Sequence, residues 1–224
     1  MPAAELASIG ALIADPTRAE MLCVLMDGTA HTGGELARHL GVSASTTSEH
    51  LSRLLDAQLV KVEAQGRHRY FRLADQQTAE LLELLGAVST PVTPNRSRTA
   101  ERLSHARSCY DHLAGEVAAN LYRRLVEDRH LTVDDGHAEL TATGTALFGQ
   151  VGVDVASVMA STRQTVRPCL DWTERRHHLA GALGAALFDT MLTHTWIRRG
   201  RQPRSIVISS KGADALHIHF GLAR

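Results

Sequence analysis

The stretch ELARHLGVSASTTSEHLSRLLDAQLVKVEAQGRHRYFR, residues 35–72, decides how the N-terminal part of this chain folds. Leu36 and Leu40 lie at helical spacing, and Gly41 supplies the positive φ at which a helix can end. Small hydroxylated residues from Ser43 onward can cap a second helix, residues 43–55, whose buried stripe is Leu51, Leu54 and Leu55. The stretch therefore predicts two helices joined by a tight turn.

Two short strands are expected directly after the second helix. Residues 59–63 and 68–73 are rich in β-branched and aromatic side chains and flank a turn at residues 65–67. Gly66 stands where such a hairpin needs a left-handed residue. Helix, turn, helix and hairpin in this order predict a winged helix-turn-helix, within an α+β fold that is mainly α with small β-hairpins.

The second helix and the hairpin carry polar groups suited to duplex DNA. The exposed stripe of the helix would present short hydroxyl groups and one long cation, which fit a major groove. Arginines along the hairpin would rest on the DNA backbone, where phosphate contacts add affinity without sequence information. We expect DNA contacts from Ser43, Ser45, Thr46, Thr47, Ser48, His50, Arg53, Arg67, Arg69 and Arg72.

These residues resemble the ArsR/SmtB family of bacterial winged-helix repressors. The resemblance runs from about Leu6 to Leu85, and its motifs are residues 14–22 (ADPTRAEML), 35–37 (ELA), 40–43 (LGVS) with Ser48, His50 and Leu51, and the wing QGRHRYF at residues 65–71. It implies a homodimeric transcriptional regulator, usually a repressor, that leaves its double-stranded operator when an inducer binds. The resemblance does not name the inducer.

Two departures from the family bear on the inducer. The family's best-known metal sensors carry a Cys-rich motif at the start of the helix before the recognition helix, where this chain has Glu35-Leu36-Ala37. The family's other familiar metal site uses His and acidic residues on the dimer helix, where residues 76–88 offer Glu80 and Glu83 but no His. Any signal must therefore come from elsewhere, and the extra C-terminal portion is the place to look.

Composition and length predict two domains in a soluble, cytoplasmic protein. The chain has 224 residues, and the stretch 91–98 combines Pro91 and Pro94 with polar residues, which is typical of a linker. We expect a DNA-binding and dimerisation domain over residues 1–90 and a sensing or interaction domain over 99–224. No apolar run of about 18 residues predicts a membrane span, and no leader sequence is evident.

Two helices are expected to form the dimer interface. The first helix and the helix Gln76 to Val88 keep apolar faces that the DNA-reading part leaves unpaired. Asp15 would cap the helix that has Pro16 in its first turn, within the apolar run from Ala11 to Met26. Cys23 lies in this run, so we expect it to be a small buried residue.

A weak internal repeat is visible in the C-terminal portion. The tetrapeptide HLAG occurs at residues 112–115 and 178–181, where each copy should begin a helix. LTATG at residues 140–144 and ISSKG at 208–212 follow the two copies, and Cys109 and Cys169 precede them. The pattern predicts two helix-hairpin repeats about a pseudo-twofold axis, although so short a similarity is also compatible with chance.

The most specific chemical feature of this portion is a stripe of His and Cys residues. His105, Cys109, His112 and Glu116 are spaced as neighbours on one face of a predicted helix. Imidazole and thiolate groups on adjacent turns can share an ion such as Zn²⁺, with a second segment supplying the remaining ligands. We expect metal or thiol sensing through His105, Cys109, His112 and Cys169; Asp171, His177 and His178 are further candidates beside Cys169.

Other interpretations of the C-terminal portion stay open at this stage. Oxidation of Cys109 and Cys169 to a disulfide would lock the two repeats without any metal. An apolar pocket for an organic ligand is a third interpretation, with Tyr110, Trp172, Phe188 and Trp196 as lining residues. The stripe is also compatible with a plain structural face. The basic segment Arg198 to Arg204 is interpreted as a solvated hairpin tip, or as an extra phosphate contact.

An enzyme is the rival class, and the sequence argues against it. The chain contains no P-loop, nucleophile elbow, dinucleotide-binding glycine motif or zinc-hydrolase helix. An architectural DNA-binding protein without an inducer is another alternative, in which the C-terminal domain would serve only as scaffold. The interpretation we favour is a dimeric repressor released from its operator by a metal, thiol oxidation or a small molecule.

Overall fold

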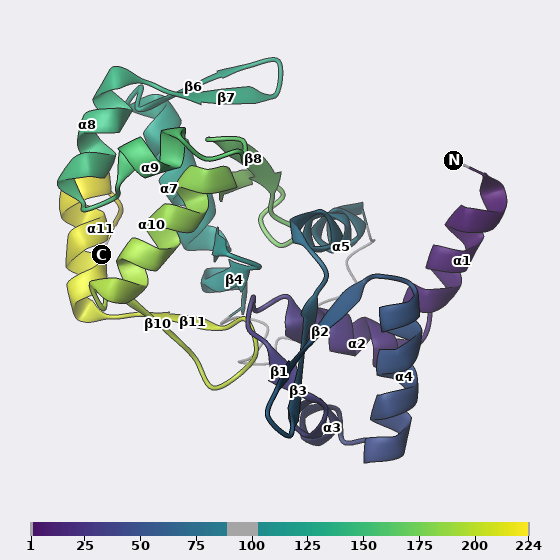
Figure 1. The fold of residues 1–224 in the computed structure, drawn as a ribbon. Coiled ribbons are helices and arrows are strands. Elements are labelled where there is room, and N and C mark those ends of the chain that lie inside the picture. The colour runs from purple at the N-terminus through teal and green to yellow at the C-terminus, as the bar shows by residue number, and fades with distance from the viewer. Residues whose placement is uncertain (1, 89–102, 224) are drawn as a thin grey trace. The chain divides into compact units, whose positions relative to one another are not determined.

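The computed structural model describes residues 2–88 and 103–223, and it divides into two compact units, Met1–Leu82 and Glu83–Arg224 (Figure 1). The boundary falls within one helix, so that this helix begins in the first unit and ends in the second. The predicted linker, residues 91–98, lies outside the described residues. In chain order the first elements are α1 (Ala3–Ile13), α2 (Pro16–Leu25), β1 (His31–Thr32), α3 (Gly33–Leu40), α4 (Ala44–Asp56), β2 (Val60–Gln65), β3 (His68–Leu73) and α5 (Gln76–Val88).

Local capping sets the ends of these helices. The Asp15 carboxylate accepts a hydrogen bond from the Arg18 amide and starts α2 at Pro16, as predicted. Thr32 and Glu35 form a capping box at the start of α3. Gly41 ends that helix with φ of 67°. The helices therefore begin and end at residues whose chemistry was visible in the sequence.

A three-stranded sheet completes the first unit. Its strand order is β1-β3-β2, and β2 and β3 form the predicted hairpin with Gln65 opposite His68. Gly66 has a φ of 59° in the turn. Leu36, Leu54 and Phe71 are buried between the helices and the sheet. The first unit is therefore the predicted winged helix-turn-helix, with α4 in the position of the recognition helix.

Cys23 departs from its prediction. We expected it to be buried in the apolar run of α2, but its side chain is exposed. Its helix turns Met21, Leu22 and Leu25 inward. Cys23 falls on the other face, because a helix covers the core with only part of its circumference.

The second unit repeats one order of elements twice. Each repeat is hairpin, helix, hairpin, helix, and a short helix stands between the repeats. The first repeat comprises β4 (Arg107–Cys109), β5 (His112–Ala114), α7 (Glu116–Glu127), β6 (Leu131–Asp134), β7 (His137–Leu140) and α8 (Ala142–Gln150), followed by α9 (Val155–Met159). The second comprises β8 (Arg167–Leu170), β9 (His177–Ala180), α10 (Gly181–Thr193), β10 (Ile197–Arg199), β11 (Ile206–Ile208) and α11 (Ser210–Phe220).

One part of the sequence prediction was wrong here. The residues from His105 to Glu116 do not form a continuous helix, because Tyr110 takes a φ of 60° and the chain turns back as the β4–β5 hairpin. The HLAG segments form the second strand of each hairpin, and their glycines, Gly115 and Gly181, precede the helices with φ of 91° and 83°. The predicted repeat itself is confirmed.

The same local contacts recur in both repeats. Thr141 and Ser209 each cap the last helix of their repeat, and each hydroxyl also donates to a backbone carbonyl at the preceding hairpin, on His130 and Trp196. One turn into each helix a glycine lies against that carbonyl. The close approach requires glycine, because a Cβ at Gly212 would lie 2.0 Å from the Trp196 carbonyl oxygen.

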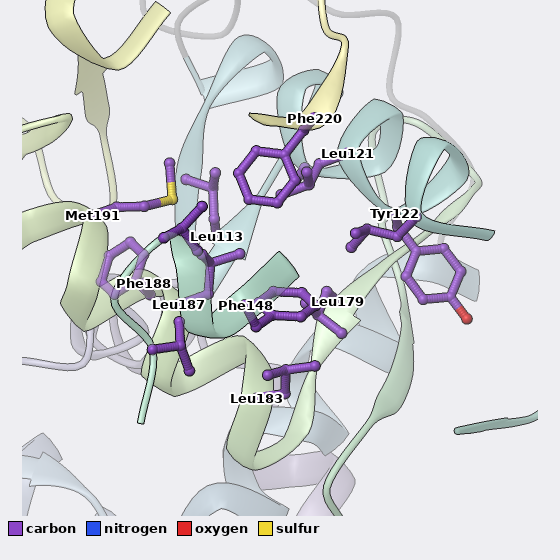
Figure 2. Close-up of a cluster of buried hydrophobic side chains, with 14 of the residues drawn as sticks. Leu113, Leu121, Tyr122, Phe148, Leu179, Leu183, Leu187, Phe188, Met191 and Phe220 are labelled. Atoms are coloured by element: carbon purple, nitrogen blue, oxygen red, sulfur yellow. The ribbon is translucent and has the colours of Figure 1, made fainter. Parts of the chain in front are cut away.

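Both repeats contribute to one hydrophobic core in the second unit (Figure 2). Leu121 and Phe148 come from the first repeat, while Leu183, Phe188 and Phe220 come from the second. All of these side chains are nearly or fully buried. The two repeats are thus one folding unit, and their hairpins are held at a defined distance from each other.

The glycine contacts lead to a first prediction. Replacing Gly212 with alanine is expected to destabilise the second unit by about 2–3 kcal/mol, since the new methyl group must displace backbone. Gly149→Ala in α8 is the matched control, because its Cβ would meet no atom within 4 Å. Tryptophan fluorescence during urea unfolding measures both, because Trp172 and Trp196, the only tryptophans, lie in this unit. Equal midpoints for the two variants would contradict the close packing.

Candidate metal centre and nucleic-acid interface

Two hairpins of the second unit each present a cysteine opposite a histidine. In the first hairpin Cys109 on β4 pairs with His112 on β5, and in the second Cys169 on β8 pairs with His178 on β9. Directly opposite residues of an antiparallel pair place their side chains on the same face. Each hairpin therefore offers one thiol and one imidazole side by side.

The packing of the repeats brings the two hairpins together. β5 lies against β9, α7 packs on β9, and α10 packs on β5, so that each helix contacts the hairpin of the other repeat. One ligand atom from each of the four residues lies within 4.8 Å of the others. The side chains are all buried, with 2% of Cys109, 2% of His112, 6% of Cys169 and 0% of His178 exposed. We call these four residues the Cys/His cluster.

A carboxylate lies beside each imidazole ring of the cluster. The Nε2 atoms of His112 and His178 face each other at 3.1 Å, and the rings stack with centroids 5.1 Å apart. Their Nδ1 atoms face outward, at 3.1 Å from Asp111 Oδ1 and 3.5 Å from Asp171 Oδ2. Metal-binding histidines generally have such a carboxylate on their second nitrogen. Both Nε2 atoms are therefore directed into the cluster.

The two carboxylates are themselves held by arginines. Asp111 pairs with Arg163 at 2.8 Å, and Asp171 pairs with Arg107 at 3.0 Å, the latter with both side chains fully buried. Asp171 also accepts hydrogen bonds from the amides of Gly115 and Thr173. Burial alone would raise the pKa of Asp171, but Arg107 and these donors hold it well below its usual range. The carboxylate is therefore ionised and fixed.

The thiols of the cluster differ in their acidity. The hydrogen bond from Cys109, with further support from His112 and His178, lowers the pKa of Cys169 far below its usual value. Burial, and then the neighbouring Cys169, raises the pKa of the Cys109 thiol well above its usual value. The Cys169 thiol therefore ionises more readily than the Cys109 thiol. A cation of sufficient charge would favour the loss of the second proton.

The donor set fits a tetrahedral metal ion. Zn²⁺ in structural sites takes four such ligands at about 2.0–2.3 Å, which places neighbouring ligand atoms about 3.3–3.8 Å apart. The separation of 3.1 Å between the two Nε2 atoms is close to this ligand-to-ligand distance. The four ligands come from two segments far apart in the sequence, so that an ion here would link the two repeats. This is the geometry of a closed site with four protein ligands.

Most residues predicted to contact DNA lie on one exposed surface. Ser43, Ser45, Ser48 and Arg53 of α4 and its cap are exposed, as are Arg67, Arg69 and Arg72 of the wing, and Thr46 is half-buried. A groove runs between α4 and the wing, with Ser48, Ser52, Arg67 and Arg69 among its lining residues. Arg53 and Arg72 form exposed ion pairs with Glu49 and Glu63. Arg53 and Arg72 therefore add little uncompensated positive charge to this surface.

Two of the predicted DNA contacts are not on this surface. Thr47 is 1% exposed, and its hydroxyl donates to the Ser43 carbonyl within the helix. His50 is half-buried and faces α2, with its Nδ1 atom 3.4 Å from Arg18 and 3.7 Å from Asp15. Both belong to the face with which α4 packs on its neighbours. Burial corrects the assignment of Thr47 to DNA contact, while that of His50 stays a prediction.

Comparison with known proteins matches these features to one family. The model of the bacterial regulatory proteins of the arsR family matches residues 15–62, which span α2 to β2. The HTH-type transcriptional regulator YdfF of Bacillus subtilis is 40% identical over 220 residues, which cover 97% of each chain. This chain belongs to the ArsR family. It is a DNA-binding transcriptional regulator with a winged helix-turn-helix.

Other ArsR-family proteins match a smaller part of the chain. The HTH-type transcriptional regulator CmtR of Mycobacterium tuberculosis is 40% identical over 97 residues, which cover 43% of this chain and 81% of CmtR. The NMR structure of the cadmium metal-sensor CMTR from the same organism is 37% identical and covers 41% of this chain and 92% of that chain, with a TM-score of 0.32.

The structure sorts the residues that the sequence singled out for sensing. Cys109, His112 and Cys169 come together, and His178, named as a further candidate, completes the set. His105 does not join it, because its side chain is 59% exposed and pairs with Glu116 at 3.1 Å. Asp111, which orients His112, was missed. The repeated spacing Cys-x-Asp, in Cys109 to Asp111 and Cys169 to Asp171, was the signal that would have found it.

The aromatic residues predicted to line an apolar pocket, and the basic segment Arg198 to Arg204, lie outside the Cys/His cluster of this ArsR-family chain. Phe188 belongs to the core, Trp196 stacks on His194 and His219, and Trp172 lies under the Arg107 guanidinium at 4.8 Å. The basic segment forms β10 and the loop before β11, and its last residue, Arg204, turns inward to Glu83. Among the described residues no helix is long and apolar enough to cross a bilayer.

Proposed function

We propose that this ArsR-family regulator is a homodimeric repressor whose affinity for operator DNA is lowered when a divalent metal ion binds at Cys109, His112, Cys169 and His178. The observation that carries the proposal is the buried convergence of four metal-ligating side chains from two repeats. Cys and His clusters of this composition favour Zn²⁺ or the chemically similar Cd²⁺. The description of CMTR as a cadmium sensor supports metal sensing as a property found within the family.

Charge supports a divalent ion in particular. Two thiolates and one divalent cation sum to zero, and the imidazoles add no charge. A monovalent ion such as Cu⁺ would leave one negative charge in a site where all four ligands are buried. Asp111 and Asp171 are already compensated by Arg163 and Arg107. The cluster therefore accommodates a divalent cation with the smallest electrostatic cost.

Residues of the chain itself orient the metal ligands and shield them from water. Asp111 hydrogen-bonds the His112 ring, and Asp171 lies 3.5 Å from the His178 Nδ1 atom, which favours Nε2 pointing inward in both. The surrounding core excludes water from the ligands. Cys109, His112, Cys169 and His178 would hold an ion whose bonds would link β4–β5 to β8–β9. The ion-free and ion-bound arrangements of the two hairpins would be the two states whose balance metal binding shifts.

Dimeric DNA binding rests on the exposed faces of the chain. Leu6 on α1 is 58% exposed, and Leu84 and Val88 on α5 are 56% and 80% exposed. A second copy of the chain would cover them. Two copies of α4 would then read two half-sites, and the wing arginines would contact the backbone. A change in the spacing of the two recognition helices lowers operator affinity.

Operator binding measured with and without metal tests this function. The reduced protein and a fragment of its own promoter region are titrated with chelator, Zn²⁺ or Cd²⁺ present, and random duplex serves as control. Metal is expected to lower operator affinity by about 5–150-fold, the usual range of allosteric coupling. No preference for the promoter fragment would refute the DNA-binding part. Equal operator affinity in all three conditions, combined with a loss on adding peroxide, would replace metal by thiol oxidation of Cys109 and Cys169.

A further inference from the structure

The last turns of α5 are linked through Arg204, in the loop before β11, to the strand that carries the first cysteine of the cluster. Glu83 on α5 is only 3% exposed, and its carboxylate pairs with the Arg204 guanidinium. The Arg204 Nε atom also donates to the Ser108 carbonyl at 3.1 Å, and the Ser108 amide donates back to the Arg204 carbonyl at 2.7 Å. Ser108 is the neighbour of Cys109 in β4. Glu83 is therefore linked to the neighbour of Cys109 through Arg204, which forms one side-chain and one backbone hydrogen bond with the Ser108 backbone.

The segment after the second cysteine also touches α5. Gly86 lies one turn beyond Glu83, and a Cβ there would be 3.6 Å from the Trp172 side chain. The Trp172 ring carries the Arg107 guanidinium at 4.8 Å, and Arg107 pairs with Asp171. Trp172 follows β8 by two residues. One face of α5, formed by Glu83 and Gly86, is therefore linked through Arg204 to β4 and lies against Trp172, which follows β8.

We infer that Glu83 and Arg204 transmit the state of the Cys/His cluster to α5. This inference rests on the proposed function, since it assumes that metal occupies the cluster. Because α5 is continuous from Gln76, it begins in the unit that holds the winged helix-turn-helix and ends at the two hairpins. A rigid helix of this kind carries a displacement at its last turns to the residues that precede it.

The energetics favour movement of α5 over separation of the Glu83–Arg204 ion pair. If an ion held at the cluster were to shift β4, the two hydrogen bonds between Ser108 and Arg204 would move Arg204 with Ser108. Glu83 must then follow, because a buried carboxylate left without its guanidinium is strongly unfavourable. The charge pair is therefore the connection whose removal should separate metal binding from the response of α5.

Hydrogen exchange of α5 tests the inference on the full chain. Amide exchange of residues 83–88 is compared with and without one equivalent of Zn²⁺, in the wild type and in Glu83→Gln, which keeps the shape but removes the charge. Zn²⁺ is expected to slow exchange in the wild type and to change it at least about threefold less in Glu83→Gln, the scale of mutations along a coupling route. Zn²⁺ affinity, measured by chelator competition, should be the same in both proteins.

Two further variants control the experiment. Glu80→Gln makes the same change one turn earlier on α5 and should behave as the wild type, whereas Arg204→Lys keeps the charge and should retain part of the response. Unaltered metal-dependent exchange in Glu83→Gln overturns the inference, and so does a wild type that binds Zn²⁺ without any change in α5. If the wild type binds no Zn²⁺ at all, the competition assay reveals that the proposed function itself has failed, and the inference falls with it.

Discussion

Replacing Cys169 with serine is expected to abolish stoichiometric Zn²⁺ and Cd²⁺ binding. Cys169 is the thiol of the pair that ionises more readily, because the Cys109 hydrogen bond and the two imidazoles favour its thiolate. A serine hydroxyl stays protonated and is a poor ligand for these ions. Removing a residue that only hydrogen-bonds a metal ligand already lowers metal affinity about 10–100-fold. Removing the ligand Cys169 itself should therefore lower it more than ~100-fold. Chelator competition measures the affinity directly.

The same variant should lose its response on DNA. Without the thiolate, the operator affinity of Cys169→Ser should be equal with and without metal, and peroxide should have no effect through a Cys109–Cys169 disulfide. Cys23→Ser is the matched control, since Cys23 is exposed on α2 and belongs to the other unit. His105→Ala should also behave as the wild type. A Cys169→Ser protein that still binds one ion tightly would show that the four residues are not the site.

The sequence predicted the DNA-reading half well because its signals are local. Asp15, Thr32 and Ser43 start their helices through side-chain caps, and Gly41 and Gly66 take the positive φ that their turns need. Each of these caps and turns involves residues within four positions of each other. The orientation of α4 was predicted less completely, since Thr47 and His50 face inward where α2 and the rest of the unit pack on the helix.

The cluster was predicted only in part because its geometry depends on residues far apart. Cys109 and His112 are separated by a two-residue turn, and in sequence the spacing is equally compatible with a helix. What favours the hairpin is the second repeat, since α10 packs on β5 and α7 packs on β9. The repeat of HLAG and of Cys-x-Asp carried this information, but only as a pattern over some sixty residues. His178 and Asp111 follow from that symmetry, and His105 does not.

Replacing Asp171 with asparagine is expected to be the most destabilising single change near the cluster. Asp171 and Arg107 are both fully buried and pair at 3.0 Å, so the variant leaves a buried guanidinium without its counter-ion, which costs about 3–5 kcal/mol. The side-chain amide of the new asparagine adds to this loss of stability. Asp171 Oδ1 accepts from the Thr173 amide and Oδ2 from the Gly115 amide, so an NH₂ group in either position would face another donor.

Tryptophan fluorescence of the reduced, metal-free protein in urea measures this loss in the second unit alone. Asp154→Asn is the control, because Asp154 is an exposed helix cap at α9, a position where asparagine serves as well as aspartate. Its unfolding midpoint should stay unchanged. Because Asp171 orients His178, the folded fraction of Asp171→Asn should also bind Zn²⁺ about 10–100-fold more weakly. A variant with wild-type stability and metal affinity would mean that Arg107 and His178 are held in place by the remaining core.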